Sequence, residues 1–223
     1  ILKRRSMRGK CIVIGAGDLT VGELQREAGD FVIAVDGGAD YCRILDLQPD
    51  LILGDFDSVS AEGAEIVNSL EKQSPERVLR LPQEKDDTDM LAALKAGLQR
   101  GYRDFRIYGG CGGRLDHTLA NIQCLLYLKK QGAVGYLLEG TGMILVLWNE
   151  EIAFRKNMKG ILSLFSLVER STGVYIKGMK YLLSDAVVSN DFPVGISNEF
   201  IGEQAVISVR NGALACMIQY TEE

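Results

Sequence analysis

The sequence has little histidine and no paired cysteines. His117 is the only histidine of the 223 residues, and the five cysteines form no CxxC pair. A zinc site needs several Cys, His or carboxylate ligands, and a histidine-based triad needs a Ser or Cys nucleophile motif beside the imidazole. Neither site is therefore supported. The cysteines fall mostly within apolar segments, so we expect buried, reduced thiols in a cytoplasmic protein.

The sequence also lacks a net positive charge and a long apolar run near its basic start. The net charge is −5, and no cluster of Lys and Arg follows an aromatic stripe, which argues against nucleic acid as a partner. The apolar run after the basic start spans only residues 11–14, too short for a signal sequence or a membrane span. At 47% hydrophobic and 25% charged residues, the chain is typical of a globular protein with one large or two modest domains.

The hydrophobic pattern changes near residue 140. Before it, short β-like runs alternate with helical patterns, as in βαβ units; the expected strands are 11–14, 31–35, 51–53, 78–81, 105–108 and 134–138, and the clearest helices are 88–100 and 115–130. After it, the expected strands are 143–148, 152–155, 161–167, 174–177, 205–210 and 214–220. We therefore predict an α/β fold with a Rossmann-like parallel-sheet domain, residues 1–140, followed by an all-β sandwich domain, residues 141–223.

Glycines and carboxylates follow the predicted parallel strands. The loops read IGAGD (14–18), VDGGAD (35–40), LGDFDS (53–58), QEKDDTD (83–89) and YGGCGGRLDH (108–117). In a parallel sheet these loops emerge at the carboxyl edge, where ligands of open α/β sheets bind. Glycine lets the backbone approach phosphates, but GxxxxGK[ST] and a convincing GxGxxG are both missing. Each glycine loop alone is as consistent with an ordinary turn as with a phosphate site.

Aspartates are concentrated at the same predicted edge, namely Asp36, Asp55, Asp57, Asp86, Asp89 and Asp116. Two carboxylates ~5 Å apart repel by roughly 3 kcal/mol at an effective dielectric constant of ~20. Mg²⁺ would relieve that repulsion, because it binds one or two carboxylates together with substrate phosphates. The alternatives are a solvated turn at residues 55–57 and a helix cap at residues 86–89.

Arg114 follows two glycines at the predicted start of a helix. That position favours bidentate contact with a phosphate, although a surface ion pair is the alternative. For His117, a cap or a nucleotide contact is favoured over catalysis.

Taken together, these motifs resemble those of the thiamine pyrophosphokinase family. The resemblance rests on DGG (36–38), GDFDS (54–58), KDDTD (85–89), GRLDH (113–117), GMKYL (178–182) and SNE (197–199), in the family's order. It implies an ATP-binding α/β domain, a β-sandwich domain for thiamine binding and dimerisation, and a homodimer. It also implies transfer of pyrophosphate from ATP to the thiamine hydroxyl, giving thiamine diphosphate and AMP.

The resemblance also implies roles for particular residues. Mg²⁺ would be held by Asp55, Asp57 and Asp86, and thiamine by Ser197 and Asn198. The expected ATP contacts are Gly15, Asp18, Asp36, Gly37, Gly38, Gly110, Gly113, Arg114 and His117. The expected catalytic residues are Asp57, Asp86, Asp89, Arg114 and Asp116, with Asp89 or Asp116 as the base. The ring that stacks on thiamine stays open among Trp148, Tyr175, Tyr181, Phe192 and Phe200.

Two other functions fit parts of the pattern. A haloacid-dehalogenase-type phosphatase or mutase also has DxD after a strand, and Asp55 would then be its nucleophile. A non-catalytic nucleotide sensor would keep the glycines but need fewer acids at the sheet edge.

Overall fold

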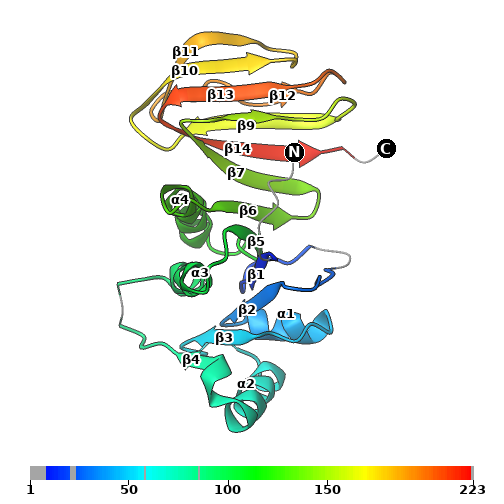
Figure 1. Cartoon of the computed structure of the whole chain (residues 1–223), viewed down its shortest axis with the longest axis vertical. Coiled ribbons are helices and arrows are strands. Elements are labelled where there is room, and N and C mark those ends of the chain that lie inside the picture. The colour runs from blue at the N-terminus through cyan, green and yellow to red at the C-terminus, as the bar shows by residue number, and fades with distance from the viewer. Residues whose placement is uncertain (1–8, 21–23, 58, 85, 222–223) are drawn as a thin grey trace. The chain divides into compact units, whose positions relative to one another are not determined.

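A computed structural model of the chain describes residues 9–20, 24–57, 59–84 and 86–221 (Figure 1). These residues form two compact units. One contains the described residues up to Cys124 together with Ala133–Gly140, and the other contains Leu125–Gly132 and the described residues from Thr141 onward. None of the described helices combines the length and apolar character that crossing a membrane requires.

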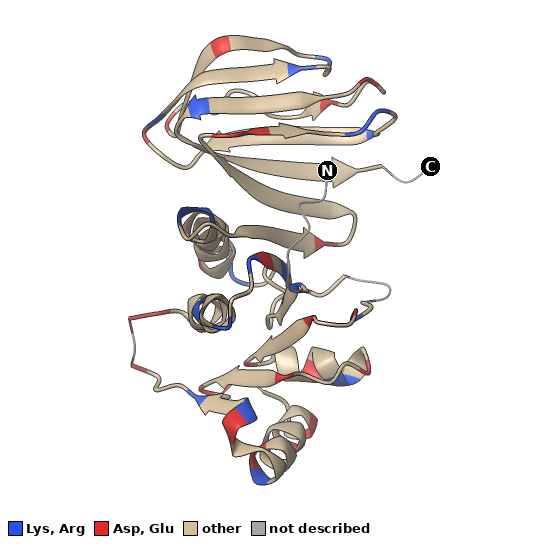
Figure 2. Ribbon diagram, in the orientation of Figure 1, with Lys and Arg blue, Asp and Glu red and all other residues tan. Residues whose placement is uncertain are grey.

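The first unit is built around parallel strands. They are β1 (Cys11–Ile14), β2 (Phe31–Val35), β3 (Leu51–Gly54), β4 (Val78–Arg80), β5 (Asp104–Tyr108) and β6 (Val134–Glu139). Their order is β6-β5-β1-β2-β3-β4, and each neighbouring pair is parallel. Charged residues lie mainly on helices and loops, and the central strands carry few (Figure 2). The chain runs outward from β1 to β4 and then returns to β5, so a ligand crevice is expected beyond the carboxyl ends of β1 and β5.

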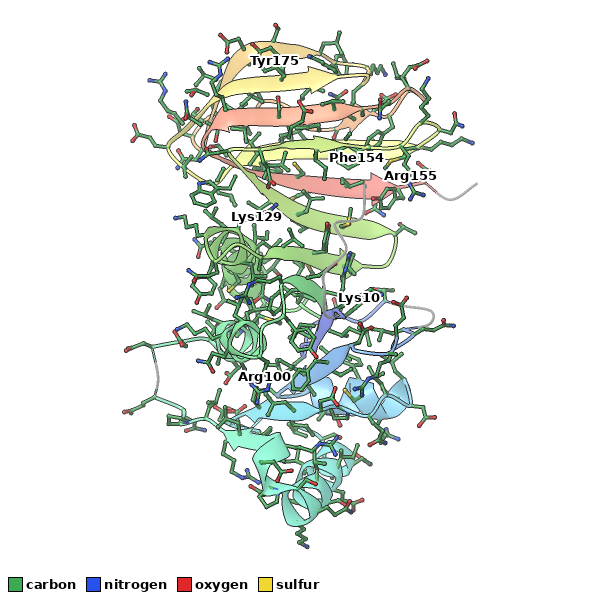
Figure 3. The ribbon with its side chains drawn as sticks, in the orientation of Figure 1. Lys10, Arg100, Lys129, Phe154, Arg155 and Tyr175 are labelled. Carbon is green, nitrogen blue, oxygen red and sulfur yellow. The ribbon has the colours of Figure 1, made fainter. Side chains whose placement is uncertain are left out.

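Helices cover both faces of this sheet, which explains why β1, β2 and β3 read as continuous apolar runs. They are α1 (Gly38–Ile44), α2 (Ala61–Gln73), the 3₁₀ helix η1 (Pro75–Arg77), α3 (Asp89–Gln99) and α4 (Leu115–Lys130). Residues of α1 and α2 pack with Ile12 and Val32 in one core. On the opposite face, α3 lies close to the sheet, since a Cβ at Gly97 would be 2.6 Å from Phe105. The Arg100 guanidinium, just beyond α3, lies over the Phe31 ring (Figure 3).

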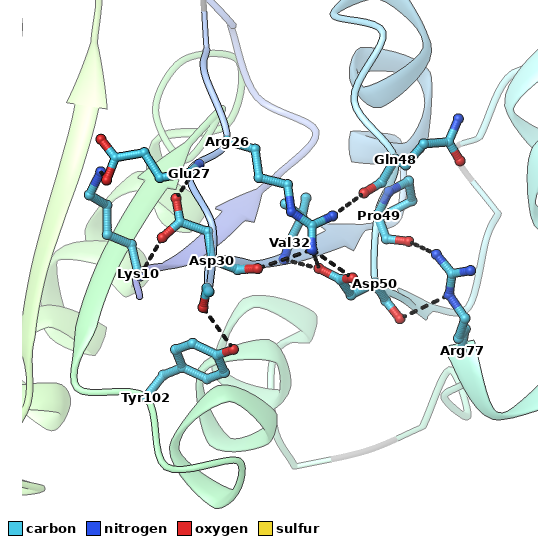
Figure 4. Close-up of polar contacts among 11 residues, drawn as sticks. Lys10, Arg26, Glu27, Asp30, Val32, Gln48, Pro49, Asp50, Arg77 and Tyr102 are labelled. Carbon is cyan, nitrogen blue, oxygen red and sulfur yellow. Dashed lines mark hydrogen bonds and ion pairs between the residues drawn. The ribbon is translucent and has the colours of Figure 1, made fainter. Parts of the chain in front are cut away.

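A polar network joins the amino ends of β1, β2 and β3 (Figure 4). The buried Asp30 carboxylate accepts a hydrogen bond from the Lys10 N–H at 2.7 Å. The Asp50 carboxylate accepts from the Val32 N–H at 2.8 Å and from the Arg26 guanidinium at 2.9 Å. Because the network lies at the amino edge, it holds the strands together at the edge opposite the glycine loops.

The second unit contains two groups of antiparallel strands. Its strands are β7 (Gly142–Trp148), β8 (Glu151–Ala153), β9 (Gly160–Ser166), β10 (Arg170–Lys177), β11 (Leu183–Ser189), β12 (Asn198–Glu199), β13 (Val206–Asn211) and β14 (Ala213–Tyr220). The orders are β12-β9-β14-β7 and β11-β10-β13-β8. Buried residues alternate with more exposed ones, as Leu162 and Leu164 do in β9, which is the pattern of a sheet with one face in a core. The predicted fold class, an α/β region followed by an all-β sandwich, is confirmed.

The predicted strands are present, with ends shifted by a few residues. The strand expected at 174–177 begins earlier, at Arg170. Its first residues were not predicted because Gly173 (φ 64°), which lies at a register shift, interrupts the apolar pattern. Strand β11 was not predicted, because Val188 is its only fully buried residue. The division at residue 140 stays a prediction, since Leu125–Gly132 at the end of α4 group with the second unit.

Candidate functional site

The loops after β1 and β5 are bonded to each other. The Gly15 N–H donates to the Tyr108 carbonyl and the Gly17 N–H to the Gly109 carbonyl, each at 2.8 Å. A Cβ at Gly15 would lie 2.5 Å from the Gly109 oxygen, and one at Gly109 would lie 2.6 Å from the Gly15 oxygen. Glycine is therefore required at both positions by close backbone contact, which explains Gly15, one of the glycines predicted to contact ATP.

The Gly110 carbonyl is held by Asn121, which was not among the predicted site residues. The Nδ2 atom of Asn121, a buried residue of α4, donates to the Gly110 carbonyl at 2.8 Å. A buried polar side chain without such a partner would be destabilising, so this bond fixes the loop against the helix. A polar residue on the apolar face of α4, beside Ile122 and Leu125, is the signal that could have identified it.

Asp36 organises the loop that carries Asp55 and Asp57. Asp36 has a positive φ of 47°, and its Oδ1 accepts the Phe56 N–H at 3.4 Å. Gly54 leaves room for this carboxylate, because a Cβ there would lie 1.7 Å from Asp36 Oδ1. Asp36 thus links the loop after β2 to the loop after β3.

The two carboxylates of the DFD segment follow β3 directly. Asp55 is half-buried and its Oδ1 accepts the Asp57 N–H at 3.2 Å, whereas Asp57 is exposed. Phe56 between them has φ 64° and lies under the Arg80 guanidinium at 5.0 Å. Ser58, the last residue of the GDFDS motif, lies outside the described residues. The segment is a tight turn that presents one exposed carboxylate and one half-buried carboxylate at the carboxyl end of β3.

Gly37 and Gly38 bring α1 close to β1. Gly37 precedes the helix, and a Cβ at Gly38 would lie 2.0 Å from the Ile14 carbonyl oxygen. Both residues are buried, and their place at the carboxyl end of β2 agrees with the predicted edge.

The aspartates at residues 86–89 have different surroundings. Asp87 forms an ion pair with Lys95 at 2.6 Å, and the Thr88 hydroxyl caps α3 by accepting the Leu91 N–H at 3.2 Å. Asp86 is exposed, and Asp89 is half-buried in the first turn of α3. The helix-cap alternative therefore holds for Thr88. Lys85 of this motif lies outside the described residues.

Arg114 and Asp116 form an ion pair at the start of α4. Arg114 Nη2 lies 2.6 Å from Asp116 Oδ2, and Arg114 Nε donates to Asp116 Oδ1 at 3.2 Å. The hydrogen bond from Arg114 lowers the pKa of Asp116, which weakens this carboxylate as a base. The surface ion pair considered for Arg114 is therefore present. His117 is exposed, and its backbone N–H donates to Asp116.

The remaining glycines of the loop after β5, Gly112 and Gly113, differ in their surroundings. A Cβ at Gly112 would lie 2.1 Å from Oδ2 of the exposed Asp18. Gly113 has φ 62°, and nothing lies within 4 Å of its Cβ position. Gly113 is thus the glycine of this loop with open space beside its backbone, next to Arg114.

Among the residues that the structure describes, no three His, Cys, Asp or Glu side chains lie close enough to hold a metal ion together. Mg²⁺ needs fewer protein ligands, since it keeps several waters and binds one or two carboxylates plus phosphates. The adjacent carboxylates of Asp55 and Asp57 fit that smaller requirement. Metal binding by Asp55, Asp57 and Asp86 stays a prediction.

The residues predicted to bind thiamine lie beside strand β9. Ser197 is exposed with φ 55°, and its N–H donates to the Ser163 hydroxyl at 3.0 Å. Asn198 is buried in β12. Phe200 is also buried and packs edge-on against Phe154 at 5.5 Å, so it has no free face to stack on a ligand.

Cys111 lies in the loop after β5, yet its thiol is expected to be unreactive. Burial, and the nearby Glu139 carboxylate, raise its pKa to about 12. All five cysteines are free and buried, as predicted. Because the thiolate is the reactive form, alkylation of Cys111 by iodoacetamide at pH 8 should be on the order of 1,000-fold slower in the native protein than in urea. Peptide mass spectrometry over time measures this rate, and rapid native labelling of Cys111 would contradict the expectation.

Comparisons with known proteins match this arrangement. Residues 24–137 match the family described as thiamin pyrophosphokinase, catalytic domain, and residues 149–214 match thiamin pyrophosphokinase, vitamin B1 binding domain. The thiamine pyrophosphokinase of Bacillus subtilis (strain 168) is 30% identical over 192 residues, which cover 85% of this chain and 87% of that protein.

Solved structures of thiamine pyrophosphokinases are also similar to this chain. A thiamine pyrophosphokinase from Bacillus subtilis superposes with a TM-score of 0.84 at 25% identity, covering 96% of this chain and 100% of that one. A thiamin pyrophosphokinase family protein from Enterococcus faecalis gives 0.79 at 28% identity, with the same coverage. These matches favour a pyrophosphokinase over the phosphatase and the nucleotide sensor. The chain belongs to the thiamine pyrophosphokinase family.

Proposed function

We propose that the chain uses ATP to convert thiamine into thiamine diphosphate, with the site at the carboxyl edge of the parallel sheet. The observation that carries this proposal is the gathering of the Gly15, Asp36, Asp55 and Gly109 loops where the strand order reverses. That edge is where open α/β sheets bind nucleotides.

Asp55, Asp57 and Asp86 would hold Mg²⁺ together with the phosphates of ATP. Bound there, the ion would neutralise charge on the phosphate oxygens. The exposed Asp57 and Asp86 and the half-buried Asp55 are accessible to a polyphosphate. Without a cation, a polyphosphate would meet several carboxylates of like charge at this edge.

The remaining ATP contacts are assigned to the loops described above. We place the phosphates against Gly15, Asp36, Gly37, Gly38 and the loop after β5. The residues placed at the border of this phosphate site are Asp18, Gly110, Gly113 and His117. Gly113 supports this placement because open space surrounds its Cβ position. Arg114 would leave Asp116 and donate to phosphate oxygens, which its bidentate guanidinium suits.

The reaction is an in-line displacement. The thiamine hydroxyl oxygen forms a bond to the β-phosphorus, and the bond from that phosphorus to the α,β-bridging oxygen breaks, releasing AMP. The hydroxyl proton goes to a carboxylate. We assign this role to Asp89 or Asp116, the carboxylates in the first turns of α3 and α4. Arg114 stabilises the charge that develops during the displacement.

We also propose a homodimer in the cytoplasm. Leu115 and Leu119, one turn apart on α4, are both exposed, as are Leu182 and Phe192 in the second unit. Neighbouring exposed apolar side chains, such as Leu115 and Leu119, suit an association surface. The buried free thiols agree with a reducing compartment.

The test is incubation of the purified protein with ATP, thiamine and Mg²⁺, followed by chromatography of the products. We expect equal amounts of AMP and thiamine diphosphate, and neither product when thiamine is omitted or EDTA is added. ADP with thiamine monophosphate would contradict pyrophosphoryl transfer, and free phosphate alone would favour the phosphatase.

A further inference from the structure

The side chain of Asn198 is bound to the backbone of Tyr181. Its Oδ1 atom accepts the Tyr181 N–H at 2.9 Å and the Glu199 N–H at 3.0 Å, and its Nδ2 atom donates to the Tyr181 carbonyl at 2.7 Å. Asn198 is only 2% exposed. Both acceptor positions of the amide oxygen are therefore filled, and one of its two N–H groups is used.

This arrangement is poorly suited to direct contact with thiamine. A ligand would have to reach a buried amide whose hydrogen bonds already satisfy two backbone groups of Tyr181. The amide oxygen has no acceptor position left for a ligand, and the remaining N–H belongs to a side chain that is only 2% exposed.

The segment around Tyr181 is anchored on both sides of that residue. The Lys180 N–H donates to the Glu199 carbonyl at 3.1 Å, and Lys180 and Glu199 also form an ion pair. Met179 pairs with Phe200 in an isolated β-bridge, and both are buried. The Tyr181 ring, in contrast, belongs to a residue that is 60% exposed. A fixed backbone thus presents a ring to solvent.

Such a ring suits a flat ligand stacked on the face away from the Lys180 ammonium, which lies 5.6 Å from the ring centroid. The thiazolium ring of thiamine is a cation and its aminopyrimidine ring is planar, and both stack on aromatic faces. A ring with a fixed backbone loses little further freedom on binding. Among the candidate rings, Phe200 is buried, Trp148 lies outside the vitamin B1 binding match of residues 149–214, and Tyr181 is the one whose backbone the Asn198 side chain holds.

We propose that Asn198 is a positioning residue, which acts on thiamine through Tyr181 by clamping that residue's backbone beside β12. This inference rests on the proposed function, because it concerns how thiamine is bound for that reaction. It replaces the expected direct contact between Asn198 and thiamine with an indirect one.

The test is a double-mutant cycle of Asn198→Ala and Tyr181→Ala, with KM measured separately for thiamine and for ATP. Each single variant should raise the thiamine KM about 10-fold, the range expected for loss of a stacking contact, and leave the ATP KM unchanged. The double variant should be no worse than Tyr181→Ala, because both changes remove the same contact. Additive losses, about 100-fold in the double variant, would identify Asn198 as a direct ligand and overturn the proposal. An unchanged thiamine KM in either single variant would also overturn it.

Controls separate positioning from folding. Asn190→Ala makes the same change at an exposed asparagine of the same unit and should leave both KM values unchanged. Asn198→Asp keeps the acceptor for the Tyr181 N–H but loses the donor to its carbonyl, so we expect an intermediate rise in thiamine KM. If Asn198→Ala does not fold, the cycle is run with Asn198→Asp. Wild-type protein that forms no thiamine diphosphate would refute the proposed function, whereas an active wild type with additive losses would refute only the role of Asn198.

Discussion

Replacing Asp57 with alanine is expected to lower turnover by at least about 100-fold and to leave the fold intact, since losing one preorganised electrostatic contact in an active site has an effect of that size. Asp57 is exposed at the carboxyl end of β3, so its removal opens no cavity in the core. The change also removes one of two adjacent carboxylates, which relieves repulsion with Asp55. Release of AMP gives the rate, and thermal unfolding gives the stability.

Glu65→Ala is the matched control for this variant. Glu65 is an exposed acid on α2, so its removal makes the same change in net charge away from the loop after β3. We expect it to keep wild-type turnover. Asp57→Asn, which keeps the shape but not the charge, should resemble Asp57→Ala. Near-normal turnover of Asp57→Ala, with Mg²⁺ at the wild-type concentration, would rule out Asp57 as a metal ligand.

Elements with strong periodicity were the ones that the sequence could predict. Helix α4 was expected at residues 115–130 and is found at Leu115–Lys130, because Ile122 and Leu125 recur at helical spacing and Gly132 follows the helix. The first strands were predictable for a different reason, since burial on both faces makes them short continuous apolar runs. Strand β11 lacks both signals, because Val188 is its only buried residue.

The position of the candidate site could be predicted, but the individual roles of its residues could not. Parallel strands carry their following loops to one edge, so the order of motifs along the chain was sufficient to place them together. The contacts of single side chains depend on tertiary neighbours. The link from Asp36 to the Phe56 N–H joins residues 20 apart, and the clamp from Asn198 to Tyr181 joins residues 17 apart. No local pattern signals either contact.

Arg114→Ala is expected to lower turnover about 100-fold or more with little loss of stability. Arg114 immediately precedes α4, where the helix dipole disfavours a positive charge, and its exposed ion pair with Asp116 is of a kind that adds little stability. Its position is therefore explained better by a phosphate than by folding. Arg114→Lys keeps the charge but not the bidentate geometry, so we expect it to recover only part of the rate.

Arg43 provides a control with the opposite expectation. It is an exposed arginine in the last turn of α1, where the helix dipole favours a positive charge. Arg43→Ala should therefore lower the melting temperature slightly and leave turnover unchanged. Arg114→Ala should instead lower turnover and leave the melting temperature nearly unchanged. Both quantities are measured on the same preparations, by thermal unfolding and by AMP release. If Arg114→Ala retained wild-type turnover, or lost activity only in proportion to a loss of folded protein, Arg114 would be a structural residue at the start of α4 and not a phosphate ligand.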